Sequence, residues 1–404
     1  MHILLVTHYY PPESNAPANR AYEHAQAWID QGHSVTVVTA APSHPRGEIY
    51  PGYANAFSDG VVDRVRVIRL PTIIAANKGI IARSAAFFSF FGAVLRHRRR
   101  IPASDVVIST TPQFFCGLAG WLLRGDGRPW VLEVRDLWPE SIVAVGAMRR
   151  NLAIRALEVL EIWAYRTADL VVTTTASHLR HVRQRAPAAP VVVVANGITV
   201  GLLPDERDPG DVVRRELGLG DRYVAAYFGT HGMAHRLETI LEAAERLRAN
   251  DAIRFVLAGD GAAREAIEAG VKKRRLANVL VLGQQPRERM AALWAASDAA
   301  LVLLRRSPTF EHVLPSKLIE AMSLGKPVIL GVEGEARALL EAAGAGIAIP
   351  PEDSEALAAA VVRLADEPGL TERCGAAGRA YAAQHFDRRV LAGRMAQAIE
   401  EVRT

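Results

Sequence analysis

The residues best placed to do chemistry surround one short helix, which the sequence predicts between two apolar runs. Pro315 opens this helix, Gly325 closes it, and Lys317 stands in its first turn. Free amides and the helix dipole favour negative charge there, so a lone cation indicates an anion nearby. Glu320 lies one turn further along the same face, where a carboxylate suits the diol of a ribose. These residues suggest a nucleotide pocket, while an ion pair between Lys317 and Glu320 explains the same spacing.

A second phosphate signal follows the strand predicted at Tyr223–Phe228. Gly229, Thr230 and Gly232 come directly after it, and such small residues let backbone amides approach a phosphate. Arg236 follows at the start of the next helix, with a guanidinium that stays protonated. These residues indicate a phosphate site.

Two carboxylates follow another apolar strand, predicted at Trp130–Val134. Asp136 and Glu140 come just after its end, and open α/β sheets bind ligands at the carboxyl ends of their strands. We therefore treat both as catalytic candidates. The alternative is a loop ion pair between Arg135 and Asp136, with Trp138 in the core.

The 404 residues, half of them apolar, are too many for one ordinary core and predict two α/β domains. The formal charge of +5 indicates an anionic partner. Cys116 and Cys374 have neither metal-ligand spacing nor a disulfide framework, which fits a reducing compartment. The first residues are interpreted as a strand and not as a signal peptide, so we expect a cytoplasmic protein without a metal site.

One segment, Thr72–Arg100, combines four phenylalanines with a basic cluster at 96–100. Aromatic side chains beside arginines are typical of a helix that lies on an anionic membrane. The alternative is a core helix whose basic end is solvated. Its apolar stretch, Ser84–Leu95, is too short to cross a bilayer.

The two stretches Pro315–Met322 and Gly325–Ile329 resemble the nucleotide-sugar motif of retaining family 4 glycosyltransferases. The resemblance implies the GT-B fold, with two Rossmann-like domains whose parallel sheets face a central cleft. It also implies Glu320 on the ribose. The family usually has another Glu eight positions earlier, where this chain has His312, with Glu311 one residue before it. That role stays open between the two.

The same resemblance extends the donor site. It implies that the donor diphosphate is held by Gly229, Thr230, Gly232, Arg236 and Lys317. It assigns Phe310, Glu311, His312, Val313 and Ser316 to the loop that holds the donor sugar or phosphate. It places the nucleobase near Gly283 and Gln284.

On the acceptor side the resemblance points to the loop Tyr9–Arg20, where relatives often have paired glycines. This chain has none there, so side-chain contact is the expectation, from Asn15, Asn19 and Arg20. The expected division is an acceptor-binding domain at 1–198, with a C-terminal helix at about 386–404, and a nucleotide-sugar domain at 199–385.

Arg135–Ser141 resembles a narrower branch, which includes N-acetyl-L-fucosamine transferases of bacterial surface-polysaccharide synthesis. This implies transfer of an N-acetylated deoxyhexose from a UDP-sugar, without a cofactor, to an undecaprenyl-diphosphate-linked saccharide of O-antigen, capsule or exopolysaccharide. Such a protein would work at the inner face of the cytoplasmic membrane and would not bind nucleic acid. Asp136 would replace a histidine that many relatives carry after the strand at Asp105–Ser109.

Two other functions fit the same architecture. One is an isomerase like UDP-N-acetylglucosamine 2-epimerase, which would form an epimer without any acceptor. The other is a non-catalytic nucleotide-sugar-binding protein, which would bind without turnover.

Overall fold

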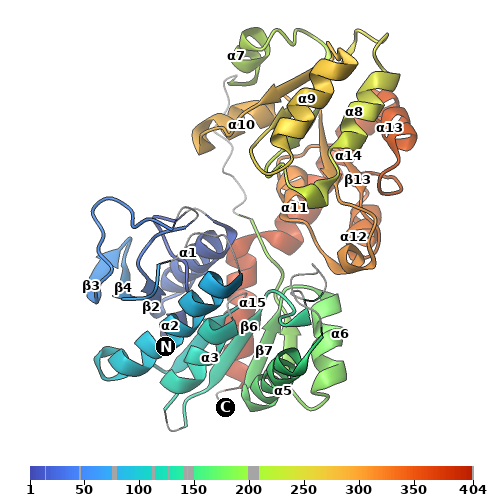
Figure 1. The fold of residues 1–404 in the computed structure, drawn as a ribbon. Helices are drawn as coiled ribbons and strands as arrows, with labels where there is room; N and C mark the ends of the chain where they lie inside the picture. The colour runs from blue at the N-terminus through green and yellow to red at the C-terminus, as the bar shows by residue number, and fades with distance from the viewer. Residues whose placement is uncertain are drawn as a thin grey trace. The chain divides into compact units, whose positions relative to one another are not determined.

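The computed structural model describes residues 1–13, 15–44, 47–74, 80–111, 114–125, 127–140, 143, 150–198 and 209–402. The chain forms two compact units (Figure 1). The first comprises Met1–Asn196 and Arg388–Thr404, and the second comprises Gly197–Asp387. The predicted linker at Leu203–Gly210 lies mostly outside the described residues.

The first unit is built on an eight-stranded sheet. Its strands are parallel except for the edge pair β3–β4. Both faces are buried, which explains why most of these strands are continuous apolar runs. In spatial order the strands are β3 (Ser58–Val62), β4 (Val65–Leu70), β2 (Ser34–Ala40), β1 (His2–Val6), β5 (Val106–Thr110), β6 (Trp130–Val134), β7 (Leu170–Thr173) and β8 (Val191–Val193).

Helices cover both faces of this sheet, because alternate strand residues point to opposite sides. One face packs against α1 (Ala16–Asp30) and the C-terminal α15 (Arg388–Glu401). The indole of Trp28 on α1 donates to the Ala392 carbonyl of α15 over 3.0 Å. The other face packs against α2 (Ile80–His97), α3 (Phe114–Leu123), α5 (Leu152–Thr167) and α6 (Ala176–Arg185).

The second unit has a six-stranded, fully parallel sheet. Its order is β11 (Val279–Leu282), β10 (Ile253–Ala258), β9 (Tyr223–Phe228), β12 (Ala299–Leu303), β13 (Val328–Gly331) and β14 (Gly346–Ala348). One face packs against α7 (Pro209–Glu216), α10 (Arg287–Ala295), α11 (Ser316–Ser323), α12 (Glu335–Ala343) and α14 (Pro368–Phe386). The other packs against α8 (Glu238–Arg246), α9 (Arg264–Arg274) and α13 (Ser354–Asp366). Strands and helices alternate along the chain, as the sequence predicts.

One predicted element is wrong. The alternation over Val61–Leu70 predicts a single half-exposed strand, but these residues form a hairpin whose turn has positive φ at Asp63 and Arg64. Arg69, expected at the surface, is 4% exposed. Its guanidinium is satisfied inside the unit, because it donates to the carbonyls of Ala40 and Pro11.

The aromatic helix α2 lies mainly against the sheet. Phe90 and Val94 are fully buried in a core with α3, whereas Phe88 and Leu95 are 55% and 46% exposed. The interpretation of α2 as a core helix therefore holds for Phe90 and Val94. No helix in the described residues combines the length and apolarity needed to cross a bilayer.

Candidate functional site

A cavity of about 420 Å³ opens at the carboxyl ends of β9, β10 and β11, beside the first turn of α11. Parallel sheets bind ligands at this edge because the loops after neighbouring strands meet there. Among the residues that line it are six of the predicted site residues: Gly229, Thr230, Gln284, Ser316, Lys317 and Glu320. The structure thus brings together the predicted diphosphate, ribose and nucleobase groups.

Lys317 is the cation of this cavity, and its position is fixed by a tyrosine. The Nζ atom of Lys317 donates to the hydroxyl of Tyr227 over 2.5 Å and lies 4.1 Å from the centre of its ring. The Tyr227 hydroxyl in turn donates to the Thr230 carbonyl over 2.8 Å. Burial lowers the pKa of Lys317 to about 8, partly offset by the nearby charge of Glu320. The lysine therefore keeps its positive charge at neutral pH.

Glu320 is exposed at the rim of the cavity. The indole of Trp294, on α10, donates to its Oε1 over 3.3 Å. This contact helps to orient the carboxylate at the rim. Pro315 precedes α11 without a side-chain cap, so the first turn offers its amides to an anion.

The floor of the cavity depends on close approach of two backbones. Gly259 has a φ of +150°, and a Cβ at this position would collide with the carbonyl oxygen of Gly229. The loops after β9 and β10 can therefore meet only because residue 259 lacks a side chain. This places the Gly229–Thr230 segment beside Lys317.

Two of the predicted diphosphate residues, Gly232 and Arg236, are not among the described residues that line the cavity. Arg236 adopts the left-handed conformation with a φ of +46°. Its guanidinium pairs with Glu238 at 3.7 Å and with Glu352 at 3.8 Å. Glu238 and Glu352 are thus the acidic neighbours of Arg236, and its contact with the diphosphate stays a prediction.

The loop before α11 contains the predicted residues 310–313. None of these four is among the described residues that line the cavity. Phe310 packs against the core, while Glu311, His312 and Val313 are exposed. A Cβ on Gly334, whose φ is +74°, would collide with the carbonyl oxygen of Glu311. The backbone of this loop is therefore held close to the start of α12, and the choice between Glu311 and His312 stays open.

Sequence reasoning missed several members of this site. Asp260, Gln285 and Met290 also line the cavity, whereas the predicted Gly283 does not, in the described residues. Tyr227 was interpreted only as part of a buried strand. A phenol in that strand, just before the glycine loop, is the signal that could have identified it.

In the first unit, Asp136 stands exposed after β6. Its backbone is anchored nearby, since the Arg135 amide donates to Thr111 Oγ1 over 2.8 Å and Trp138 stacks on Phe114 at 4.7 Å. Partial desolvation of the carboxyl raises the pKa of Asp136, and the charge of Arg135 acts in the opposite direction. Asp136 is thus presented on a well-supported loop.

Glu140, the second catalytic candidate, lies within an ion-pair cluster. Its Oε2 is 3.3 Å from His181 Nδ1 and 4.0 Å from Arg185. Both partners also contact the buried Glu161, at 3.2 Å and 2.8 Å. These contacts tie the Glu140 segment to α6.

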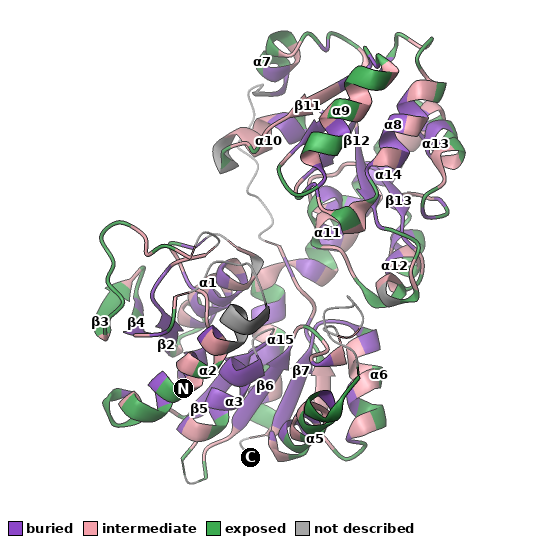
Figure 2. Cartoon of the chain, viewed as in Figure 1, coloured by how far each residue is buried: buried purple, intermediate pink, exposed green. Residues whose placement is uncertain are grey.

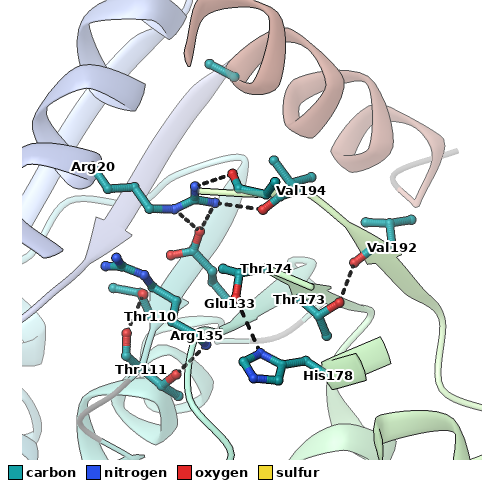
Figure 3. A network of polar contacts seen from close by, with 12 residues as sticks. Arg20, Thr110, Thr111, Glu133, Arg135, Thr173, Thr174, His178, Val192 and Val194 are labelled. Atoms are coloured by element: carbon teal, nitrogen blue, oxygen red, sulfur yellow. Dashed lines mark hydrogen bonds and ion pairs between the residues drawn. The ribbon is translucent and has the colours of Figure 1, made fainter. Parts of the chain in front are cut away.

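Arg20, predicted on the acceptor side, has a structural position instead (Figure 3). It is 4% exposed and pairs with Glu133, while its guanidinium also donates to the carbonyls of Ala195 and Val194. Burial alone would raise the pKa of Glu133, but Arg20 and Arg135 hold it at about 2. Arg20 is occupied inside the unit, so we correct this assignment.

The two asparagines of the same loop differ in role. Asn15 caps α1, because its Oδ1 accepts from the Ala18 amide over 2.9 Å. Its buried Nδ2 has no partner within the described structure. Asn19 lies half-buried in the first turn of the helix.

The chain matches the family model for group 1 glycosyl transferases over residues 211–381 and the model for a glycosyl transferase 4-like domain over residues 15–197. One match falls in each unit, and together with the two parallel sheets they define the class. The chain belongs to these glycosyltransferases and is an enzyme with the GT-B fold.

Individual relatives agree with this class. Escherichia coli WcaI, named as a colanic acid biosynthesis glycosyl transferase, is 27% identical over 379 residues, covering 89% of this chain and 91% of WcaI. Sucrose-phosphate synthase from Thermosynechococcus elongatus superposes with a TM-score of 0.75 at 19% identity, covering 99% of this chain and 98% of that chain. Anabaena HepE, solved with UDP-glucose, gives 0.71 at 17% identity, covering 99% and 100%. At these identities the two solved structures establish the fold.

Proposed function

We propose that this glycosyltransferase moves a sugar from a UDP-sugar to an undecaprenyl-diphosphate-linked saccharide, in the synthesis of a bacterial surface polysaccharide such as O-antigen, capsule or exopolysaccharide. The observation that carries the proposal is the cavity in which Lys317 and Glu320 stand together at the first turn of α11. The name of WcaI, a colanic acid biosynthesis enzyme, supports the polysaccharide product. The UDP-glucose complex of HepE supports the donor class.

In this proposal the protein stabilises the departing nucleoside diphosphate. Breaking the sugar–phosphate bond leaves negative charge on the diphosphate, and Lys317, the α11 amides and the Gly229 loop surround the place where that charge develops. Glu320 accepts from the ribose hydroxyls, and Gln284 lies where it could contact the base. No cofactor takes part, and the UDP-sugar is a substrate.

The transferred sugar is proposed to be an N-acetylated deoxyhexose, moved with retention of configuration. Asp136 and Glu140 are the proposed acceptor-side carboxylates. The lipid-linked acceptor would bring the enzyme to the inner face of the cytoplasmic membrane.

Donor binding is tested first, with a thermal-shift panel of UDP, GDP, CMP and NAD. A ligand that binds only the folded protein raises the melting temperature by mass action. We expect UDP alone to stabilise the wild type, and Glu320→Ala to lose that effect. Glu355→Ala, an exposed residue on α13, is the matched control and should respond as the wild type does. No UDP shift in the wild type, or an unchanged shift in Glu320→Ala, would refute the pocket assignment.

Turnover then separates transfer from isomerisation. The enzyme is incubated with a series of UDP-sugars, with and without a polyprenyl-diphosphate-linked saccharide. We expect UDP release that depends on the acceptor and a glycosylated lipid product. An epimerised UDP-sugar formed without acceptor would contradict the proposed reaction.

A further inference from the structure

Helix α5 presents a row of apolar side chains to solvent. Leu152, Val159 and Trp163 are 81%, 68% and 36% exposed. Their spacings of seven and four residues place them on one side of the helix, and the exposed Ala156 lies between them. This side of α5 is therefore an apolar strip.

A tryptophan on the neighbouring helix widens the strip. Trp121 of α3 meets Trp163 edge-to-face, with ring centres 5.2 Å apart and an angle of 77° between the planes. Although the two rings pack against each other, Trp121 stays 39% exposed. We name Trp121, Leu152, Val159 and Trp163 the tryptophan face.

The tryptophan face plays no part in the core of its own unit. The inward side of α5 already packs on the sheet through Ala164 and Tyr165, which are at most 2% exposed. Figure 2 shows much of α5 as exposed while α3 is largely buried. Four large or branched apolar side chains gathered at one exposed place are unusual for a surface that faces only water.

The charges around the tryptophan face are mostly positive. Arg155 and Arg166 of α5 are exposed and stand three residues after Leu152 and Trp163, so they border the apolar strip. Helices α3 and α6 contain no acidic residue. On α5, Glu161 is buried and paired, and Glu158 is partly buried and lies 4.0 Å from Arg150. The rim is therefore basic.

We propose that the tryptophan face docks this protein on an anionic lipid bilayer. Tryptophan rings favour the boundary between acyl chains and head groups, and arginines beside them attract lipid phosphates. The outer surface of a helix offers no groove for a bound peptide, so it suits a bilayer surface better. The strip is too short to span a bilayer. This assignment differs from the expectation for α2, whose Phe90 and Val94 are committed to the core. It stands on these exposed side chains and does not depend on the proposed donor or acceptor.

Vesicle co-sedimentation of the full chain tests the proposal. The vesicles contain phosphatidylethanolamine with phosphatidylglycerol, and phosphatidylcholine vesicles serve as the neutral comparison. We expect binding to the anionic vesicles, weakened by salt. The double variant Leu152→Glu/Val159→Glu should bind the anionic vesicles at least about tenfold more weakly. It removes apolar area that would be buried in the bilayer, and it adds negative charge that the anionic lipids repel.

The matched control is Val61→Glu, which changes a 73% exposed valine on the edge strand β3. It should bind as the wild type does, and all variants should keep the wild-type melting temperature. The proposal is overturned if the wild type binds no vesicles, if neutral vesicles bind equally well, or if Leu95→Glu on α2 abolishes binding while the α5 variant does not. It is also overturned if the wild type is a dimer that the α5 variant dissociates.

Discussion

The Nζ atom of Lys317 lies 2.5 Å from the hydroxyl oxygen of Tyr227, a residue 90 positions earlier in the chain. The same hydroxyl donates to the Thr230 carbonyl. One phenol therefore links the helix that carries the cation to the loop after β9, so the two halves of the anion site are held together before any donor binds.

Replacing this hydroxyl should weaken donor binding more than it weakens the fold. Tyr227→Phe keeps the ring and removes both hydrogen bonds, so we expect UDP affinity to fall about fivefold to tenfold. Isothermal titration calorimetry with UDP measures the effect. Tyr10→Phe, which removes a buried hydroxyl with no partner in the described structure of the other unit, is the control and should bind UDP normally. Equal affinities for wild type and Tyr227→Phe would show that Lys317 needs no such support.

The depressed pKa of Lys317 predicts a pH dependence of UDP binding. In the free protein the ammonium is protonated below pH 8 and loses its charge as the pH rises through about 8. Affinity should be nearly constant just above neutral pH and then fall by up to about tenfold per pH unit. Lys317→Arg keeps its charge over this range, so its profile should be flat. The same decline in both proteins would assign the titration to another group.

The buried pair of Arg20 and Glu133 predicts a large loss of stability on substitution. Arg20→Met leaves a buried carboxylate without its main partner, which costs about 3–5 kcal/mol. Calorimetric melting should show a clear drop for Arg20→Met and partial recovery in Arg20→Met/Glu133→Gln. The control Arg64→Met breaks an exposed pair with Asp30 and should cost less than about 1 kcal/mol. A small effect at Arg20, combined with lost acceptor binding, would restore its predicted role on the acceptor side.

Gly259→Ala should damage both stability and donor binding. Its methyl group would collide with the Gly229 carbonyl and separate the two loops that form the floor of the cavity. Gly344→Ala is the control for a positive φ without a collision, because Gly344 has a φ of +59° and no atom lies within 4 Å of the added Cβ. We expect a cost of about 1 kcal/mol at Gly344 and several times more at Gly259. Thermal melts with and without UDP compare the two.

The order of strands and helices follows from the sequence because buried parallel strands are continuous apolar runs ended by glycine or polar turns. The burial of Arg69 on β4 escaped prediction for a physical reason. Alternating arginines suggest a solvated face, but the partners that satisfy Arg69 are carbonyls 29 and 58 residues earlier in the chain. Such partners exist only after the chain has folded.

The same distinction holds within the site. The position of Lys317 and Glu320 at one cavity could be predicted, because a cation in the first turn of a helix is locally unfavourable and indicates an anion site. Their roles in donor binding stay predictions. Arg20 was predicted as a ligand residue because no partner for it is visible nearby in the sequence. Its actual partner, Glu133, is 113 positions away. Tyr227 was missed because its role depends on a hydroxyl contact across the sheet edge. A sequence shows which residues are close along the chain, so local interactions can be predicted from it. Hydrogen bonds and ion pairs between distant residues cannot be predicted in the same way.

The ends of the second unit meet. The amide of Ile198 donates to the Phe386 carbonyl over 2.9 Å, and Ile198 pairs with Asp387 as an isolated bridge. Both termini of the chain belong to the first unit, where α15 completes the core beside α1. The second unit, which carries the proposed donor cavity, is thus an insertion whose entry and exit are adjacent. It could be exchanged for the corresponding unit of a relative through two neighbouring junctions. Such a chimera would test whether this unit sets donor specificity, and it would leave the core of the first unit intact.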